Sequence, residues 1–385
     1  MIKISPFLRK IIFLVSILGS ICLIIISLKN ALIFSQDFQR SGAKALSLGL
    51  NPYDEFLSGD IKKIFIKSQA PNYFQTLYFL FLPFTLISNT AANLIWGILN
   101  LIMLFTSTFI LGKIYKIRNK LSLLLIFFVL ISGFPARNVI GNGQLSIFIL
   151  NFFLIGIFIQ EKLDKSQKNS FGMFLYGFSY LKYSFAPAFG MFNLIKYGLK
   201  NFLITLIPSL LGVVAMALFF RSYSSIFGPF KVSSITMANS FGIGDLLSIL
   251  TIFFQAEDGI IRYLLILICL SLSLLFVLKT TTLNLERQIP LVSLISIMFV
   301  NHLGYDYVFY ITPLVFAFSS FSNKLEKFTI FFNWTIIGHG IWILNKNNFN
   351  LNNIQFISFI FFLNFILFLV IYISGSKNKY KLFRN

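Results

Sequence analysis

Long apolar runs are the feature that most limits what this chain can fold into. Ten runs qualify as candidates for the roughly 20-residue span of a bilayer, the shorter ones by lengthening into their flanks. They lie near Ile11–Leu28, Ala91–Leu111, Leu121–Phe134, Leu145–Ile159, Phe202–Phe220, Ile260–Leu278, Leu291–Val300, Val308–Phe321, Phe328–Leu344 and Ile354–Ser374. The pattern predicts an all-α polytopic membrane protein.

The composition agrees with that class. Hydrophobic residues make up 57% of the 385 residues and charged residues only 11%, against about 25% charged in a typical soluble domain. The mean hydropathy is +0.83. These values exclude a soluble enzyme, a disulfide-stapled secreted domain and a disordered tail. Residues 1–385 are therefore expected to form a single integral membrane domain.

Two further apolar stretches are interrupted. Tyr73–Ile87 contains Pro83, and Phe171–Ile195 contains Lys182 and Pro187. Apolar pieces of about 10 to 14 residues are more often re-entrant or interfacial than spanning. We therefore expect about 10–12 transmembrane helices, together with short broken or re-entrant helices and interfacial helices on the outer face.

The distribution of charge predicts the topology. The chain has 32 Lys and Arg, 12 Asp and Glu and a net charge of +20. The basic residues are scattered in short loops, which favours orientation signals beside anionic lipid over nucleic-acid binding. The dense basic loop at 113–120 should be cytoplasmic. This fails if both the Tyr73–Ile87 stretch and the following run at Ala91–Leu111 cross the membrane fully, so we expect one of the two not to cross.

That arrangement puts both termini in the cytoplasm and the loops at 31–72 and 221–258 on the outer face of the cell membrane. The inside then holds 20 of the 32 basic residues and 4 of the 12 acids. Acids barely influence topology, so their concentration outside has another cause. Chemistry on that face is one candidate, and the greater length of the outer loops is the other.

Asp37 follows the first apolar run, close to the boundary between lipid and water. Desolvation there raises the basicity of a carboxylate, although a lone acid at this position is also compatible with an ordinary solvated side chain. Phe38–Leu50 has the pattern of an amphipathic segment lying on the membrane. Gly49 to Asp54, Gly-Leu-Asn-Pro-Tyr-Asp, reads as a turn.

The order of these features resembles the membrane glycosyltransferases of the C superfamily, in particular the polyprenyl-phosphate-mannose-dependent family 87. The resemblance covers about residues 35–315 and continues with Gly143-Gln144, with Tyr180-Leu181-Lys182 followed by Pro187, and with Asn239-Ser240. Tyr305-Asp306-Tyr307 and Pro313 lie where that family often has His-His-Tyr followed by Pro. Both of those histidines are replaced here, and His302 lies three residues earlier.

The resemblance implies an inverting hexosyltransferase that takes a sugar, such as mannose, from a polyprenyl-phosphate donor to a lipid or glycan acceptor on the outer face. Asp37 is expected to be the catalytic base. Lys182, Arg137 and His302 are candidates for the donor phosphate. Candidate substrate-binding residues are Asn51, Tyr53, Asp54, Asn142, Gln144, Asn239, Tyr305, Asp306 and Tyr307.

Each of these roles has a plainer alternative. Lys182 is also compatible with a lysine that snorkels to the surface, Arg137 with a residue that caps a helix end, and the amides with interhelical hydrogen bonds. No metal or cofactor is expected, since the sequence has no Asp-x-Asp pair, phosphate loop or His and Cys cluster with metal spacing.

Two other classes of function remain open. A transporter or lipid flippase would place Lys182 on a pathway between discontinuous helices, but such proteins are often built from repeats, and none is visible in this sequence. An envelope glycan polymerase or ligase would be expected to carry a large Arg-rich outer loop late in the chain. The Asn-rich loop at 345–353, with one Lys, does not fit that expectation.

Overall fold

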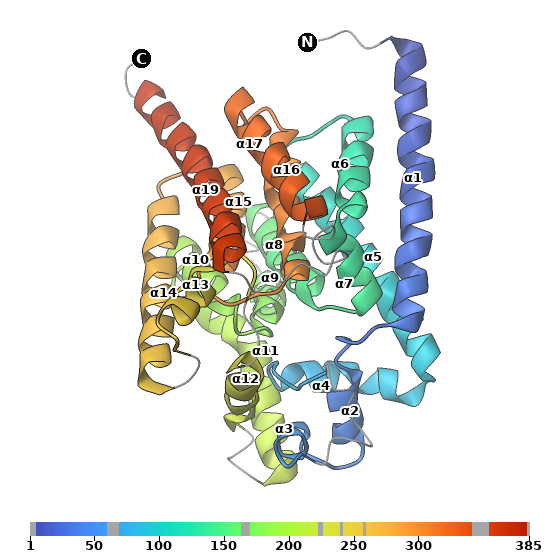
Figure 1. The fold of residues 1–385 in the computed structure, drawn as a ribbon, viewed down its shortest axis with the longest axis vertical. Coiled ribbons are helices and arrows are strands. Elements are labelled where there is room, and N and C mark those ends of the chain that lie inside the picture. Colours follow the sequence, from blue (N-terminus) through green and yellow to red (C-terminus); the bar gives the residue numbers. More distant parts are fainter. Residues whose placement is uncertain are drawn as a thin grey trace.

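The computed structural model describes residues 5–59, 69–162, 170–221, 226–238, 242–256, 259–340 and 354–382. Within these ranges the chain forms helices and no strand (Figure 1). The longest helices are α1 (Pro6–Ile33), α5 (Asn89–Ile114), α11 (Leu199–Phe220), α14 (Gly259–Thr280) and α19 (Ile354–Leu382). The predicted all-α polytopic class is confirmed.

The other elements are shorter helices. They are α2 (Arg40–Ser47), α3 (Pro52–Leu57), α4 (Thr76–Phe81), η2 (Leu82–Leu86), α6 (Lys120–Ser132), α7 (Phe134–Asn142), α8 (Ser146–Lys162), α9 (Ser170–Gly177), η4 (Phe178–Tyr180), α10 (Ala186–Tyr197), α12 (Gly228–Ala238), α13 (Leu246–Phe253), α15 (Leu285–Met298), η6 (Gly304–Tyr310), α16 (Ile311–Ala317), α17 (Lys324–Thr335) and η7 (Ile336–Gly340).

Five of the described helices are long and apolar enough to cross a membrane, or six if α6 and α7 are one bent span. The five are α1, α5, α11, α14 and the Ile354–Ser376 part of α19. Many of the large apolar side chains on α1, α11 and α14 are exposed, as expected for surfaces that face lipid. The other predicted runs form shorter helices, such as α8 with 17 residues and α15 with 14.

The run predicted at Leu121–Phe134 bends at its end. The axes of α6 and α7 differ by 70°, and Gly133 between them is extended. The ring of Trp334 occupies the place of a Cβ at Gly133, so a side chain does not fit there. Pro135 in the first turn favours the start of a new helix at this point.

Both stretches that were predicted to be broken are broken. In the first, α4 gives way to the 3₁₀-helix η2, which contains Pro83. In the second, α9 and η4 end before Leu181, and α10 begins at Ala186 with Pro187 in its first turn. Lys182 lies in the non-helical segment between them. A break in a helix leaves backbone N–H and C=O groups without helical hydrogen bonds, and in an apolar interior these groups need polar partners. Polar side chains are therefore expected near this break.

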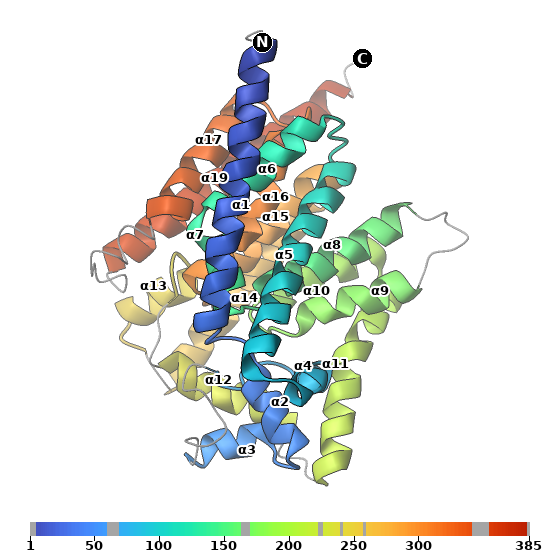
Figure 2. The ribbon, with the colours of Figure 1, turned by 90° about the vertical axis from the view of Figure 1, so that its right-hand side faces the viewer.

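The two chain ends lie at the same end of the molecule (Figure 1). The turn between α5 and α6, which carries the dense basic loop, lies toward that end as well, and α2, α3 and α12 lie at the opposite end (Figure 2). The predicted amphipathic segment Phe38–Leu50 contains α2. The helices α2 and α3 of the loop at 31–72 and α12 of the loop at 221–258 are thus grouped far from the termini, whereas α13 (Leu246–Phe253) lies nearer the middle of the molecule.

A buried ion pair joins the helices near the C-terminus. Arg287 on α15 pairs with Glu326 on α17, and its guanidinium also donates to Phe321 O at 2.8 Å and to Ile371 O at 3.1 Å. The Glu326 side chain is fully buried. Because an unpaired charge is costly in an apolar interior, this pair and its carbonyl partners hold α15, α17 and α19 together.

This grouping leads to a prediction about topology. Ser58, exposed at the end of α3, and Arg118, exposed between α5 and α6, are expected to face opposite sides of the membrane, Ser58 outside. Single cysteines at these two positions, in a Cys22→Ser, Cys269→Ser background, are treated in intact cells with a membrane-impermeant maleimide. Labelling of Ser58→Cys before permeabilisation and of Arg118→Cys only after it is expected, and the reverse order would invert the topology.

Candidate active site

The loop that carries Asp37 is held against the end of α7 by its backbone. Ser35 donates its N–H to Gly141 O at 3.3 Å, and Asp37 donates to Asn142 O at 3.0 Å. Gln36 N–H donates to Asn142 Oδ1 at 3.2 Å. Residues that are more than 100 positions apart in the chain therefore fix the Asp37 backbone.

Phe38 anchors the same loop from the other side. Its ring is stacked on Trp96 with the ring centres 5.3 Å apart and contacts Phe81 and Phe84 edge-on. Trp96 in turn donates its indole N–H to Gly143 O at 2.8 Å. Aromatic pairs of this geometry add to the burial energy of each ring, so the position of Asp37 is set by a buried neighbour as well as by backbone hydrogen bonds.

Gly143 explains why a glycine precedes Gln144. It ends α7 with φ +74°, in the left-handed region. A Cβ on it would lie 2.8 Å from the Cβ of Phe38, which is closer than side chains approach. The glycine therefore allows both the helix to end and the Asp37 loop to pack on it. Gln144 follows directly and is fully buried.

The Asp37 carboxylate lies among polar side chains from three parts of the chain. It accepts a hydrogen bond from the Asn142 amide. Burial raises the pKa of Asp37 to about 6, while the amide of Gln144 and the charge of Lys182 partly oppose this rise and the charge of Asp306 adds to it. A carboxylate with a pKa near neutrality is suited to accept a proton.

Lys182 and Asp306 form a buried ion pair beside Asp37. The Lys182 ammonium lies 2.8 Å from both carboxylate oxygens of Asp306. It also lies over two rings, 4.7 Å from the centre of Phe185 and 5.3 Å from that of Tyr305. The alternative of a lysine that snorkels to the surface does not describe this side chain, which is only 13% exposed.

Asp306 has further partners that hold it in place. It accepts from the Ser146 hydroxyl and from the backbone N–H of Leu303 at 3.1 Å. The second contact caps η6, so the position of the carboxylate is set by the start of that helix. Ser146 lies on α8, two residues after Gln144, and so ties η6 to the Gly143-Gln144 turn.

Two tyrosines, Tyr73 and Tyr305, and the amide of Gln144 also lie close to Asp37. Tyr305 and Tyr73 both lie close enough to feel the charges of Asp37 and Asp306. Gln144 lies beside Asp37 and Tyr305, yet within the described residues neither polar atom of its amide makes a hydrogen bond of good geometry. A fully buried amide with spare donor and acceptor capacity is suited to bind a hydroxyl group.

A second polar cluster lies behind the Lys182–Asp306 pair. The Nδ1 of His302 is 3.9 Å from Asp245 Oδ2, and Asp245 accepts from the N–H of Ser248 at 2.7 Å and from its hydroxyl at 2.9 Å. Burial raises the pKa of Asp245 and lowers that of His302, which favours the neutral forms of both. His302 also lies close enough to Lys182 and Asp306 for both charges to act on it.

Other predicted residues are structural or lie elsewhere. Asn51 caps α3 by accepting from Tyr53 N–H at 3.1 Å and also donates to Asp54 at 2.7 Å. Tyr53 is buried and donates to Tyr73 O at 2.7 Å. Tyr307 donates to Ile243 O at 2.8 Å, in the second cluster. Asn239 lies outside the described residues.

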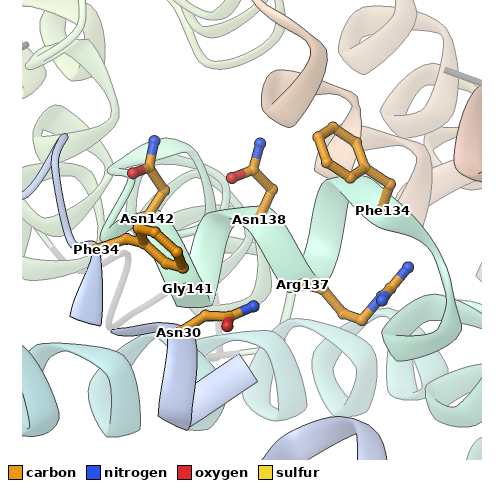
Figure 3. Close-up of a pocket in the computed structure, with 7 residues that line it drawn as sticks. All are labelled: Asn30, Phe34, Phe134, Arg137, Asn138, Gly141 and Asn142. Carbon is orange, nitrogen blue, oxygen red and sulfur yellow. The ribbon is translucent and has the colours of Figure 1, made fainter. Parts of the chain in front are cut away.

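Arg137 is separated from Lys182. It lines a cavity of about 240 Å³ between α1 and α7, together with Asn30, Phe34, Phe134, Asn138, Gly141 and Asn142 (Figure 3). The charges that act on Asp37 are those of Lys182 and Asp306, whereas that of Arg137 acts on His339. The structure therefore brings together Asp37, Asn142, Gln144, Lys182, Tyr305, Asp306 and, behind them, His302.

A larger apolar cavity lies near the helix break that carries Lys182, and the residues on both sides of the break, Tyr180 and Ala186, line it. It measures about 480 Å³ and lies between α10, α11 and α14, with Tyr180, Pro187, Met191, Leu206, Leu270 and Leu274 among its lining residues. Phe74 also lines it and donates its N–H to Leu181 O at 3.1 Å, next to Lys182. An apolar cavity near a cation suits an amphiphile with a charged head.

Three residues of the site were not among the predicted ones. Tyr73 begins the interrupted stretch Tyr73–Ile87, and Ser146 follows the Gly143-Gln144 motif by two residues. Their closeness in sequence to these features could have identified them as site residues. Asp245 had no such signal, because it meets His302 only in the folded chain. Within the described residues no group of three or more His, Cys, Asp or Glu side chains could hold a metal ion.

Comparison with protein-family models, with curated proteins and with solved structures finds no match to this chain.

The role of Gly143 can be tested against a matched glycine. Gly49 has φ +77° but open space around its Cβ position, so Gly49→Ala should cost only the about 1–2 kcal/mol of a left-handed alanine. Gly143→Ala should cost about 1–3 kcal/mol more, because Phe38 must move. Unfolding in detergent and hydrogen exchange at residues 35–39 measure the difference. Equal losses in the two variants would show that the Phe38 contact is not tight.

Proposed function

We propose that this chain is an inverting glycosyltransferase that moves a hexose from a polyprenyl-phosphate donor to a lipid or glycan acceptor, with Asp37 as the base. The observation that carries the proposal is the Asp37 carboxylate, with a pKa of about 6, close to the ammonium of a largely buried Lys182. An apolar cavity lies near the helix break that holds this ammonium. The resemblance in sequence to glycosyltransferase family 87 supports the same reaction.

The reaction assigns one task to each group. An acceptor hydroxyl attacks the anomeric carbon of the donor sugar, and its proton passes to Asp37. A bond forms from the acceptor oxygen to the anomeric carbon, and the bond from that carbon to the phosphate oxygen breaks. The phosphate leaves with the electron pair as a polyprenyl phosphate. Attack on the side opposite the leaving group inverts the anomeric centre.

Lys182 is the group that stabilises the leaving phosphate. In the free protein its charge is balanced by Asp306, so a phosphate competes with a carboxylate for the same ammonium. Stabilisation of developing negative charge by a positioned cation in a site that excludes water is one of the larger contributions to catalysis. The polyprenyl chain would occupy the apolar cavity between α10, α11 and α14, near the break that carries this cation.

Gln144 and Tyr305 would bind sugar hydroxyls. The Gln144 amide has unused hydrogen-bonding capacity beside Asp37. The Lys182 ammonium lies over the ring of Tyr305, and Tyr305 is also close enough to Asp37 for that charge to act on it. We assign this reaction to the outer face of the cell membrane, with cytoplasmic termini, on the basis of the division of basic residues between the loops.

The first prediction concerns Asp37. Replacement by Asn preserves size and the contact with Asn142 but removes the proton acceptor, so transfer from polyprenyl-phosphate mannose should fall roughly 10²- to 10⁴-fold. Purified variants, with membrane lipid extract as acceptor, are compared by radiolabel transfer. Glu55→Gln, another acid of the same loop, is the control and should stay near wild type.

An Asp37→Asn rate above about a tenth of wild type, well outside that range, would remove Asp37 as the base. A wild-type protein that binds the donor without transferring its sugar to any acceptor would favour a transporter or flippase instead.

The second prediction concerns pH. A base must be ionised, so kcat/KM should rise with pH through about 6 and level off above it, the pKa of Asp37 in the free protein. Asp306→Asn removes a charge that raises this pKa and should move the rise to lower pH. Lys182→Met removes a charge that lowers the pKa and should move the rise to higher pH, in addition to lowering the rate.

The double variant, with both charges removed, should return the rise toward its wild-type position. A pH profile that is unchanged in all three variants would mean that the titrating group is not the carboxylate next to this ion pair.

A further inference from the structure

The cavity between α1 and α7 has a chemistry unlike that of the apolar cavity. Four of its seven lining residues are polar: Asn30, Arg137, Asn138 and Asn142. Asn138 and Asn142 point the same way from successive turns of α7, while Arg137 leaves the helix on the side of Asn30 (Figure 3). Gly141, one turn after Arg137, lets α1 approach, since its Cβ would lie 2.9 Å from that of Asn30.

Arg137 is a cation that has no balancing carboxylate among the residues that the structure describes. It is half-buried and lies on the second part of the bent α6–α7 pair. Within the described residues it forms no ion pair, and its buried Nε has no hydrogen-bond partner. Lys182 and Arg287, by contrast, each have a carboxylate. An unbalanced cation in a membrane segment is costly and is retained where it has a ligand to bind.

The amides of the cavity are also available. In the described part of the chain the side chains of Asn30 and Asn138 make no hydrogen bond. Asn142 is different, because its Nδ2 donates to Asp37 and its Oδ1 accepts from Gln36 N–H. The cavity thus reaches Asp37 through Asn142.

We propose that this cavity binds an anionic group of the acceptor, a phosphate or a carboxylate, with Arg137 as the cation and Asn30 and Asn138 as hydrogen-bond donors. The inference rests on the proposed transfer reaction, in which Lys182 takes the donor phosphate and leaves Arg137 for a second anion. The acceptor is then held with its hydroxyl toward Asp37 and its charge between α1 and α7. The substrate class narrows to acidic lipids or acidic glycans.

Binding of simple probes tests the site without knowledge of the acceptor. Octyl phosphate, inorganic phosphate and octyl glucoside are titrated into the purified full chain in neutral detergent, followed by the thermal unfolding midpoint. In a Lys182→Met background, where the donor site has lost its cation, Arg137→Gln should lower the affinity for octyl phosphate about 10- to 100-fold, the range expected for charge-assisted hydrogen bonds. Arg137→Lys should restore part of this affinity. Lys29→Gln removes an exposed charge next to Asn30 and should have no effect.

Polyprenyl phosphate separates this inference from the proposed function. The affinity for polyprenyl phosphate should fall in Lys182→Met and not in Arg137→Gln, whereas the octyl phosphate binding that remains in Lys182→Met should be lost when Arg137→Gln is added. If Arg137→Gln loses octyl phosphate binding but the wild-type protein neither binds the donor nor transfers sugar, the anion site is supported and the proposed transferase function is rejected. Normal Asp37-dependent transfer with unchanged octyl phosphate binding in Arg137→Gln would reject the anion site alone.

The source of the anion follows from the probes. Stronger binding of octyl phosphate than of inorganic phosphate, lost in Arg137→Gln, indicates an acidic lipid. Equal binding of the two, lost in the same variant, indicates a soluble or glycan-borne anion, and both outcomes support the proposal. If octyl glucoside binds as well as octyl phosphate, in wild type and in Arg137→Gln alike, only an alkyl chain is recognised and the proposal is overturned.

Discussion

The ion pair between Lys182 and Asp306 is the interaction on which the arrangement of the site depends. A lone ammonium or carboxylate in an apolar interior costs several kcal/mol, so these two side chains must meet. Lys182 lies in the break between η4 and α10, and Asp306 lies in the first turn of η6, more than 120 residues later. Their pairing brings the broken stretch against η6, and Ser146 adds the start of α8 through its contact with Asp306.

The same pair sets the environment of Asp37. The two charges act on Asp37 with opposite sign, and burial dominates both. The position of Asp37 between the end of α7 and the ion pair therefore keeps its pKa at about 6. The polar cavity between α1 and α7 reaches this group through Asn142, and the apolar cavity lies near the break that carries Lys182. In the proposed reaction the two cavities would receive the two different substrates.

Much of this could be read from the sequence. The apolar runs and the interruptions at Pro83 and at Lys182 with Pro187 are local features, and the helices end where they indicate. Asp37 and Lys182 stood out because charged residues are rare in such surroundings. The Asn51-Pro52-Tyr53-Asp54 turn was also visible, but its polar groups cap α3 and do not reach Asp37. A cap and a binding site use the same residue types, so composition alone does not separate them.

The class of the protein, the places where its helices break and its two most unusual charges could all be predicted from the amino-acid sequence, because hydropathy and helix geometry depend on neighbours along the chain. The packing of the helices is what places Asp306 against Lys182, Asp245 near His302 and Asn142 against Asp37. It also leaves Arg137 without an ion pair among the described residues. The physical reason is that these contacts join segments tens of residues apart. Which polar groups meet is set by how the helices pack, and a periodic apolar pattern carries no record of that choice.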